Sequence, residues 1–462
     1  MAPDQPANGE STDVAARAGG RLMAPDQPAN GEPTDGAARA GGRLMAPDQP
    51  ANAGISRRRF LHAGAAAGAV TLIGAGATAL GAAAPSTEIS AAAPKYFGPF
   101  HGPHQAGVVE PAALTTSVVA FDVIAGSQAE LVELFHTLTD RARMLTAGGA
   151  VVNLGPVAPP DDNGILGPTL PMGQLTVTVG MGSSLFDQRF GLSDRKPARL
   201  QSMVTFPNDN LDPAQTHGDL SVMLRAADFD TVVHALRDIT KHTRGAMQPR
   251  WRIDGFVNPP RPSGTPRNFL GFKDGIANPD VTQAAVQDSL IWVQPGQPEP
   301  AWTAGGTYQV VRIIRMLVEF WDRVSLQEQE TMFGRRKDSG APLDANREFD
   351  LPNYAADPGG RVIPLTAHIR LANPRTAATA PSQILRRGFN YDRGLDVNGN
   401  LDQGLVFACY QQDIERQFEA VQTRLIGEPL VDYVSPIGGG YFFVPPGVAD
   451  ANDYFARGLF TR

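Results

Sequence analysis

The sequence predicts an α+β fold of two ferredoxin-like domains, each a sheet covered by helices on one side. Two observations support this prediction. Strand-like and helical patterns alternate in a similar order in both halves of the chain, and the proline-rich segment NPPRPSGTP at 258–266 separates the halves. In the first half the order is strand, helix, strand, strand, helix, strand, which is the ferredoxin-like pattern. We therefore place the domains at 95–265 and 266–462.

The first domain begins with a strand-like run, SVVAFDVIA, at 117–125. Ser127 and Glu130 follow with the spacing of a helix capping box, and apolar residues at helical spacing come next. The same spacing predicts a second helix at 228–241. Apolar runs predict the remaining strands at 174–181, 219–224 and 249–256.

The second domain repeats the plan. Its predicted strands are TYQVVRIIRM at 307–316, which leads into a helix, GLVFACYQ at 404–411 and YFFV at 441–444. A helix is predicted over 413–425 because one stripe carries Ile414, Phe418, Val421 and Leu425. Such a stripe is typical of a helix that packs on a sheet.

Composition favours a globular protein that acts on a small molecule. Of the 462 residues, 42% are hydrophobic, enough for a sizeable core. The net charge of −7 argues against nucleic acid as a partner. The single cysteine, Cys409, has apolar neighbours and is expected to be a buried packing residue.

The N-terminal segment contains a repeat that does not predict a repeat fold. Residues 1–22 recur almost unchanged at 23–44, and Met45 begins a third, partial copy. The copies are rich in Gly, Pro and Ala and lack periodic apolar residues, so segment 1–55 is expected to be disordered. Because the methionines recur in the same context, Met45 is favoured over Met1 as the functional start.

Segment 56–93 resembles a twin-arginine (Tat) export signal. It opens with SRRRFL at 56–61 and continues into a weakly apolar, Ala- and Gly-rich stretch over 63–83. So few leucines and isoleucines make a poor permanent membrane span, which favours cleavage near Ala84 or Ala93 over anchoring. The signal implies that the Tat translocase exports the folded chain to the periplasm, the cell envelope or the extracellular space.

Three polar segments of the second half carry the candidate chemistry. They are GFKDGIANP at 271–279, AHIRLANPR at 367–375 and LRRG at 385–388. Taken singly, the first could be a turn capped by Asp274, and His368 could be a structural histidine. Together they offer an imidazole that can bind a metal, a carboxylate and a permanent cation.

With these segments the chain resembles the dye-decolourising peroxidases, and especially the secreted branch that includes the deferrochelatase/peroxidase of ferrous iron uptake systems. The motif G-x-x-D-G at 271–275 is the family's signature. GPHQAG at 102–107 and IGGGYFF at 437–443 extend the resemblance over nearly all of the chain after the signal. The resemblance implies domains of the dimeric α+β barrel type, with one haem b per chain in the second domain.

The resemblance also implies roles for individual residues. His368 is expected to ligate the haem iron, because a neutral imidazole donates to Fe(III) and leaves the opposite face open to peroxide. On that face Arg386 would stabilise negative charge as the O–O bond breaks, and Asp274 would move a proton between the peroxide oxygens. The remaining expected haem contacts are Gly275, Ile276, Ala277, Asn373, Pro374 and Arg375, with Arg375 the candidate propionate partner.

Two interpretations stay open for Asp413. Its carboxylate could hold the ring of His368 through the second imidazole nitrogen, or it could cap the helix that begins at Ile414.

Asp274 leads to a further expectation, because an aspartate has an unperturbed pKa of about 3.9 and therefore suits an acidic optimum for dye oxidation.

The implied reaction reduces hydrogen peroxide and oxidises dyes, phenolics or similar small reductants. One alternative is a deferrochelatase that releases iron from haem, or a haem-binding protein without turnover; the presence of both Asp274 and Arg386 favours turnover. Another is a cofactor-free α+β binding module with His368 in its core. Iron-uptake proteins as partners and a homo-oligomer are left open.

Overall fold

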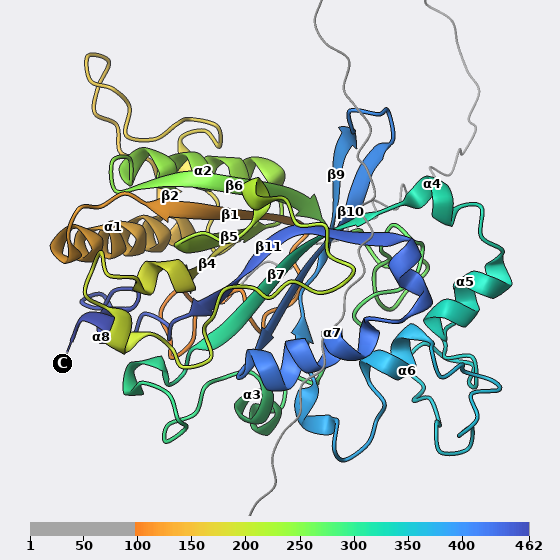
Figure 1. Cartoon of the computed structure of the whole chain (residues 1–462). Coiled ribbons are helices and arrows are strands. Elements are labelled where there is room, and N and C mark those ends of the chain that lie inside the picture. The colour runs from red at the N-terminus through yellow and green to blue at the C-terminus, as the bar shows by residue number, and fades with distance from the viewer. Residues whose placement is uncertain (1–97, 462) are drawn as a thin grey trace, which may run out of the picture. The chain divides into compact units, whose positions relative to one another are not determined.

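The computed structural model of the chain describes residues 98–461. Its centre is a nine-stranded antiparallel sheet in the order β7-β11-β4-β5-β1-β6-β9-β10-β8, in which β7 also pairs with β10. Because β7 begins this order and also pairs with β10 near its other end, the sheet closes into a barrel (Figure 1). The predicted disordered segment 1–55 and the predicted export signal 56–93 lie outside the described residues.

The first half of the barrel has the predicted ferredoxin-like order, β4-β5-β1-β6. Helices α1 and α2 cover its outer face (Figure 1). All six predicted elements are confirmed, and a small β2–β3 ladder is added in the connection after α1. The bounds are β1 (Thr115–Val123), α1 (Gln128–Ala147), β2 (Gly149–Ala150), β3 (Thr169–Leu170), β4 (Leu175–Gly182), β5 (Leu220–Ala226), α2 (Phe229–His242) and β6 (Met247–Phe256).

The predicted cap at the start of α1 is present, with one difference from the reciprocal capping box. The Ser127 hydroxyl accepts a hydrogen bond from the Glu130 N–H at 3.2 Å. The Glu130 carboxylate accepts from the Gly126 N–H at 2.8 Å rather than from that of Ser127. Both groups still fix the first turn of the helix, because each partners a backbone donor at its start.

The second half repeats the same strand order, β9-β10-β7-β11, and strands are present at its three predicted positions. Its strands are β7 (Thr307–Met316), β8 (Leu385–Arg386), β9 (Phe389–Leu395), β10 (Leu401–Gln411) and β11 (Val434–Val444). The sequence analysis did not predict β9 and placed only the last four residues of β11 in a strand, 441–444. Both segments carry polar residues or glycines that weaken the strand pattern.

The helices of the second half are short. They are α3 (Ala284–Leu290), α4 (Val318–Trp321), α5 (Leu326–Phe333), α6 (His368–Ala372), the π-helix η6 (Ile414–Glu419), α7 (Ala420–Leu425) and α8 (Arg457–Phe460). The predicted helix over 413–425 is therefore a π-helix that continues into an α-helix. Within residues 98–461, no helix combines the length and apolarity required to cross a membrane.

Alternate strand residues face the inside and the outside of the barrel. Val118, Ala120, Val311 and Ile313 belong to the interior cluster. Residues of opposite parity in the first half pack against α1 and α2 in the largest cluster of the core. Cys409 is fully buried in that cluster, which confirms the expectation of a packing residue.

The halves of the barrel meet where β6 pairs with β9 and where β11 pairs with β4, and Phe442 occupies the second junction. It pairs with Gly182 across the strands, and its side chain is fully buried in the barrel interior. We expect Phe442→Ala to lower the free energy of unfolding by about 3–5 kcal/mol, because it leaves a cavity that neighbouring strands cannot fill. Urea denaturation followed by circular dichroism would measure the change.

The matched control is Phe320→Ala, since Phe320 is 63% exposed. It should change the free energy of unfolding by no more than about 0.5 kcal/mol. Similar losses for both variants would contradict the assignment of Phe442 to the junction.

Candidate active site

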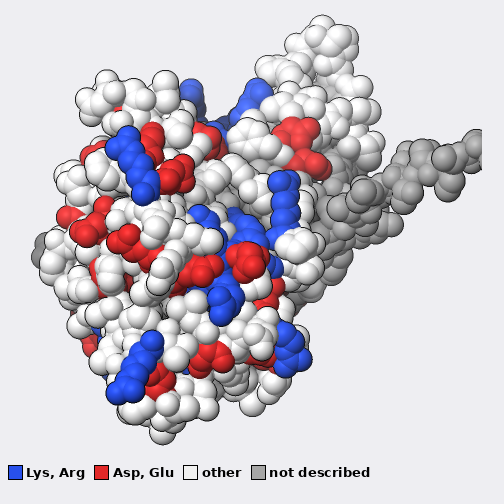
Figure 2. Space-filling model, turned by 90° about the vertical axis from the view of Figure 1, so that its right-hand side faces the viewer, with Lys and Arg blue, Asp and Glu red and all other residues white. Residues whose placement is uncertain are grey.

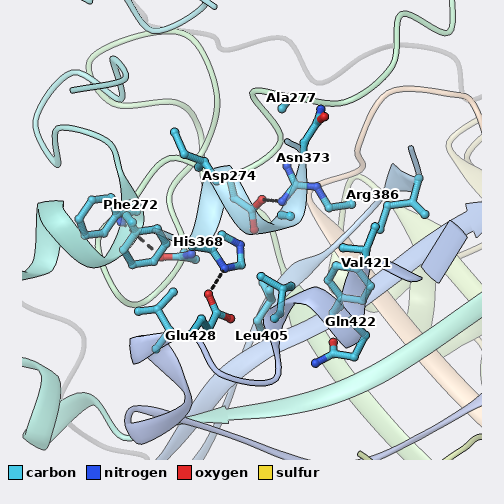
Figure 3. A pocket seen from close by; sticks show the side chains of 18 of the residues that line it. Phe272, Asp274, Ala277, His368, Asn373, Arg386, Leu405, Val421, Gln422 and Glu428 are labelled. Carbon is cyan, nitrogen blue, oxygen red and sulfur yellow. Dashed lines mark hydrogen bonds and ion pairs between the residues drawn. The ribbon is translucent and has the colours of Figure 1, made fainter. Parts of the chain in front are cut away.

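The outer face of the second half forms one wall of a cavity. Side chains of α6 and α7 line the opposite wall, so the cavity lies between sheet and helices (Figure 3). In the first half, the equivalent space is filled by the packing of α1 and α2. The wall on the sheet side includes Arg312, Ile314 and Met316 of β7 with Leu405 and Phe407 of β10.

His368 is the first residue of α6 and lines the cavity. Its Nδ1 lies 2.6 Å from Oε2 of Glu428 (Figure 3). Phe333 packs near its ring, with 5.8 Å between the ring centroids. A carboxylate can only accept, so Nδ1 carries the hydrogen in this contact. Nε2 is thereby left as the nitrogen that can bind a metal.

Glu428 also changes the titration of His368. Burial lowers the pKa of the imidazole, but attraction by the Glu428 carboxylate and its hydrogen bond outweigh burial, and the pKa is raised above its ordinary value. Of the two interpretations left open for Asp413, the contact with His368 is wrong, because Glu428 occupies that place. The Asp413 side chain accepts from the Arg416 N–H at 2.9 Å and caps η6, which confirms the alternative interpretation.

Asp274 and Arg386 form an ion pair at the same cavity. Asp274 Oδ1 lies 3.0 Å from Arg386 Nη1, and the imidazole of His368 projects between this pair and Glu428 (Figure 3). Each side chain of the pair keeps more than a quarter of its surface accessible, so both can meet a small ligand. Gly275 follows Asp274 with φ +95°, a conformation that favours glycine and turns the loop at this point.

The structure brings most of the predicted site residues together. Asp274, His368 and Arg386 line one cavity, although they are separated by up to 112 positions in the chain. The other predicted residues that line it are Ile276, Ala277, Asn373 and Arg375. Gly275 and Pro374 do not line the cavity, so they affect it through the course of the backbone.

Two arginines give the cavity an excess of positive charge. Arg335 and Arg375 line it, and neither forms a salt bridge with a carboxylate in residues 98–461. Burial, with repulsion from Arg375 and Arg386, lowers the pKa of Arg335 to about 10. Arg375 also has φ +57°, which is unusual for a residue other than glycine and is typical of a functional segment.

These features fit haem. The group needs an imidazole with a free Nε2, apolar walls for its ring, and cations for its propionates. His368 supplies the imidazole, and Leu405 and Phe407 belong to the apolar walls. Arg335 and Arg375 supply two cations for the two propionate carboxylates.

Sequence reasoning did not identify Glu428, Arg335 or Tyr354 as site residues, although all three line the cavity. Glu428 lies 60 positions from His368, and no spacing connects them. Arg335 begins the basic run RRK at 335–337, which was the only signal available for it. Nothing in the pattern of the chain distinguishes Tyr354.

Comparison with known proteins shows the family to which this chain belongs. The model of the Dyp-type peroxidase N-terminal domain matches residues 105–257, and that of the C-terminal domain matches residues 265–449. The chain belongs to the Dyp-type peroxidase family. It is therefore a haem peroxidase, and the predicted α+β fold of ferredoxin-like halves is confirmed.

Individual members of the family are similar over most of this peroxidase. The deferrochelatase of Yersinia pestis is 50% identical and covers 87% of this chain and 94% of its own. That of Escherichia coli strain K12 is 52% identical over 78% of this chain and 86% of its own. The crystal structure of a DyP-type peroxidase from Cellulomonas bogoriensis has a TM-score of 0.71 and 35% identity, covering 80% of this chain and 99% of its own.

The ion pair between His368 and Glu428 predicts a pH-dependent stability of the haem-free protein. Because the pKa of His368 is raised in the folded state, the pair makes its full contribution to the free energy of unfolding below about pH 6.5, the ordinary pKa of histidine. This contribution is lost as the pH rises through the raised pKa. Near pH 6 we expect the haem-free wild-type protein to have a higher melting temperature than haem-free Glu428→Gln. The difference should shrink towards pH 9.

Thermal unfolding of both haem-free proteins across this pH range would test the prediction. Glu415→Gln is the control, because Glu415 is an exposed carboxylate in the surface pair with Arg199. A difference between wild type and Glu428→Gln that stays constant or grows with pH would contradict the expected linkage.

Proposed function

We propose that this chain binds one haem b, with Nε2 of His368 as the protein ligand to iron, and reduces hydrogen peroxide at Asp274 and Arg386. The observation that carries the proposal is the Asp274–Arg386 ion pair in the cavity to which His368 presents its free nitrogen. Arg335 and Arg375 would hold the propionates. When bound, haem supplies the electrons that peroxide accepts.

Arg386 and Asp274 have complementary tasks in this proposal. The Arg386 guanidinium is permanently charged and stabilises the negative oxygen that develops when the O–O bond breaks. The Asp274 carboxylate takes the proton from one peroxide oxygen and delivers it to the other, which then leaves as water. Their hydrogen bond at 3.0 Å holds both groups ready at one place.

Small aromatic compounds such as dyes and phenolics are the proposed reductants. Basic and acidic side chains are interspersed over the face that includes α4 and α5 (Figure 2). Mixed charges suit small reductants of varied structure better than one polyionic partner.

Replacing either member of the pair should slow the reaction with peroxide. We expect Asp274→Asn and Arg386→Leu each to lower the second-order rate constant of the reaction with peroxide by about 10²- to 10⁴-fold. The first substitution removes the group that transfers the proton, and the second removes the charge that stabilises the negative oxygen. Stopped-flow absorbance of the haem-loaded proteins would measure the constant. The matched controls are Asp402→Asn and Arg393→Leu, which break an ion pair of the same kind away from the cavity. An unchanged constant in Arg386→Leu would contradict its role.

Dye oxidation should be faster in acid. A carboxyl group that must accept and release protons matches acidic conditions better than neutral ones. We expect the steady-state rate of dye bleaching by the wild-type protein to rise as pH falls from about 7 to about 4. A rate that rises towards neutrality would count against Asp274 as the group that moves the proton.

A second candidate function is the release of iron from haem. The names of the two relatives that share 50–52% identity with this chain favour it. The reaction replaces the iron of the porphyrin with two protons, so it yields free iron and a metal-free porphyrin. Incubation of the protein with haem and a reductant would test it, with a ferrous-iron chelator and porphyrin fluorescence as readouts. Haem that keeps its iron while peroxide is consumed would leave only the peroxidase.

We further propose that the chain is exported by the Tat pathway. The support is the SRRRFL segment at 56–61 and the weakly apolar stretch after it. Haem inserted in the cytoplasm would require a route that accepts folded cargo. Replacing Arg57 and Arg58 with lysine should retain the protein in the cytoplasm, whereas export that continues would contradict the proposal.

A further inference from the structure

The side chain of Asn278 joins the Asp274 loop to the backbone of Arg386. Its Oδ1 accepts from the Arg386 N–H at 3.0 Å, and its Nδ2 donates to the Arg386 carbonyl at 3.0 Å. The loop therefore contacts Arg386 at three places, because Asp274 also binds the guanidinium. No sequence motif used above assigns a role to Asn278.

The contact completes an edge of the sheet. Arg386 belongs to the two-residue strand β8, where it pairs with Cys409 of β10. The Arg387 N–H bonds to the Ala408 carbonyl at 2.7 Å, so the N–H and carbonyl of Arg386 point away from β10. The Asn278 amide meets both groups as the peptide of a further strand would.

The loop has independent anchors on its other side. The Asp274 N–H donates to the Pro266 carbonyl at 2.9 Å. Lys273 is buried in an ion pair with Glu348, with 2.6 Å between Nζ and Oε2. These contacts fix the position of the loop, whereas the Asn278 amide fixes Arg386 relative to it.

We propose that Asn278 is a positioning residue for the peroxide reaction, because it sets the backbone of Arg386 relative to Asp274. The side-chain pair alone is a single hydrogen bond between partly accessible groups, and such a pair permits several arrangements. With the backbone of Arg386 held at two further points, the guanidinium stays directed at the cavity. This inference rests on the proposed roles of Asp274 and Arg386.

The test compares Asn278→Ala with wild type in the haem-loaded protein. We expect the second-order rate constant with peroxide to fall about 10- to 100-fold, the cost of a misplaced catalytic group. The KM for the dye should not change. The affinity of the ferric protein for fluoride should also fall, by about tenfold, because fluoride accepts a hydrogen bond from the distal cation.

The matched control is Asn163→Ala. Asn163 likewise donates to a backbone carbonyl, that of His234 at 3.2 Å, and accepts from a backbone N–H, that of Ile165 at 3.2 Å, but does not line the cavity. It should leave the rate constant and the fluoride affinity unchanged. A similar fall in both variants would overturn the proposal, since the effect would then be general destabilisation.

Asn278→Asp gives a readout that a purely structural role would not change. A protonated carboxyl has one donor and one acceptor, like the amide, whereas a carboxylate can only accept and would repel the Arg386 carbonyl. The rate of this variant relative to wild type should therefore recover as pH falls through about 4. Asn278→Ala should show no recovery.

Asp274→Asn and Arg386→Leu, measured in the same series, separate two kinds of failure. If both react with peroxide like wild type, the proposed function fails. If both are slow while Asn278→Ala reacts at the wild-type rate and binds fluoride normally, the positioning role of Asn278 is overturned and the function stands.

Discussion

Closure of the sheet into a barrel is the constraint on which the rest of the structure depends. Once β7 pairs with both β10 and β11, the interior holds one set of alternate side chains, and each half must cover its outer face separately. The first half does so with the apolar faces of α1 and α2. In the second half, short helices stand opposite the sheet and leave a cavity. The same strand plan thus yields a packed scaffold in one half and a binding site in the other.

The site residues come from segments that only this architecture brings together. The Asp274 loop follows the proline-rich segment 258–266 that separates the halves. His368 begins α6, Arg386 lies on β8, and Glu428 follows α7. Each polar group has a local partner: Glu428 holds His368, Asp274 holds the side chain of Arg386, and Asn278 holds its backbone. Rigid support of this kind lets a few side chains act on a small substrate without a large binding surface.

Sequence patterns predicted the elements whose residues alternate or repeat clearly, and failed where packing decides. The strands and helices of the first half follow directly from apolar periodicity. β9 was not predicted because its polar residues are stabilised by pairing with β10, which is not visible in the local sequence. Asp274, His368 and Arg386 could be predicted from motifs that resemble a known family. Glu428 could not, because its contact with His368 depends on the fold alone, and for the same reason the sequence left two interpretations of Asp413 open.

The central claim is that His368 holds haem in the cavity of the second half. The most direct test is the absorption spectrum of the purified protein and of His368→Ala after loading with haem, with the exposed His136→Ala as control. The account predicts a Soret band of a histidine-ligated haem in wild type and His136→Ala, and its loss in a His368→Ala protein that remains folded. An unchanged Soret band in folded His368→Ala would contradict the account.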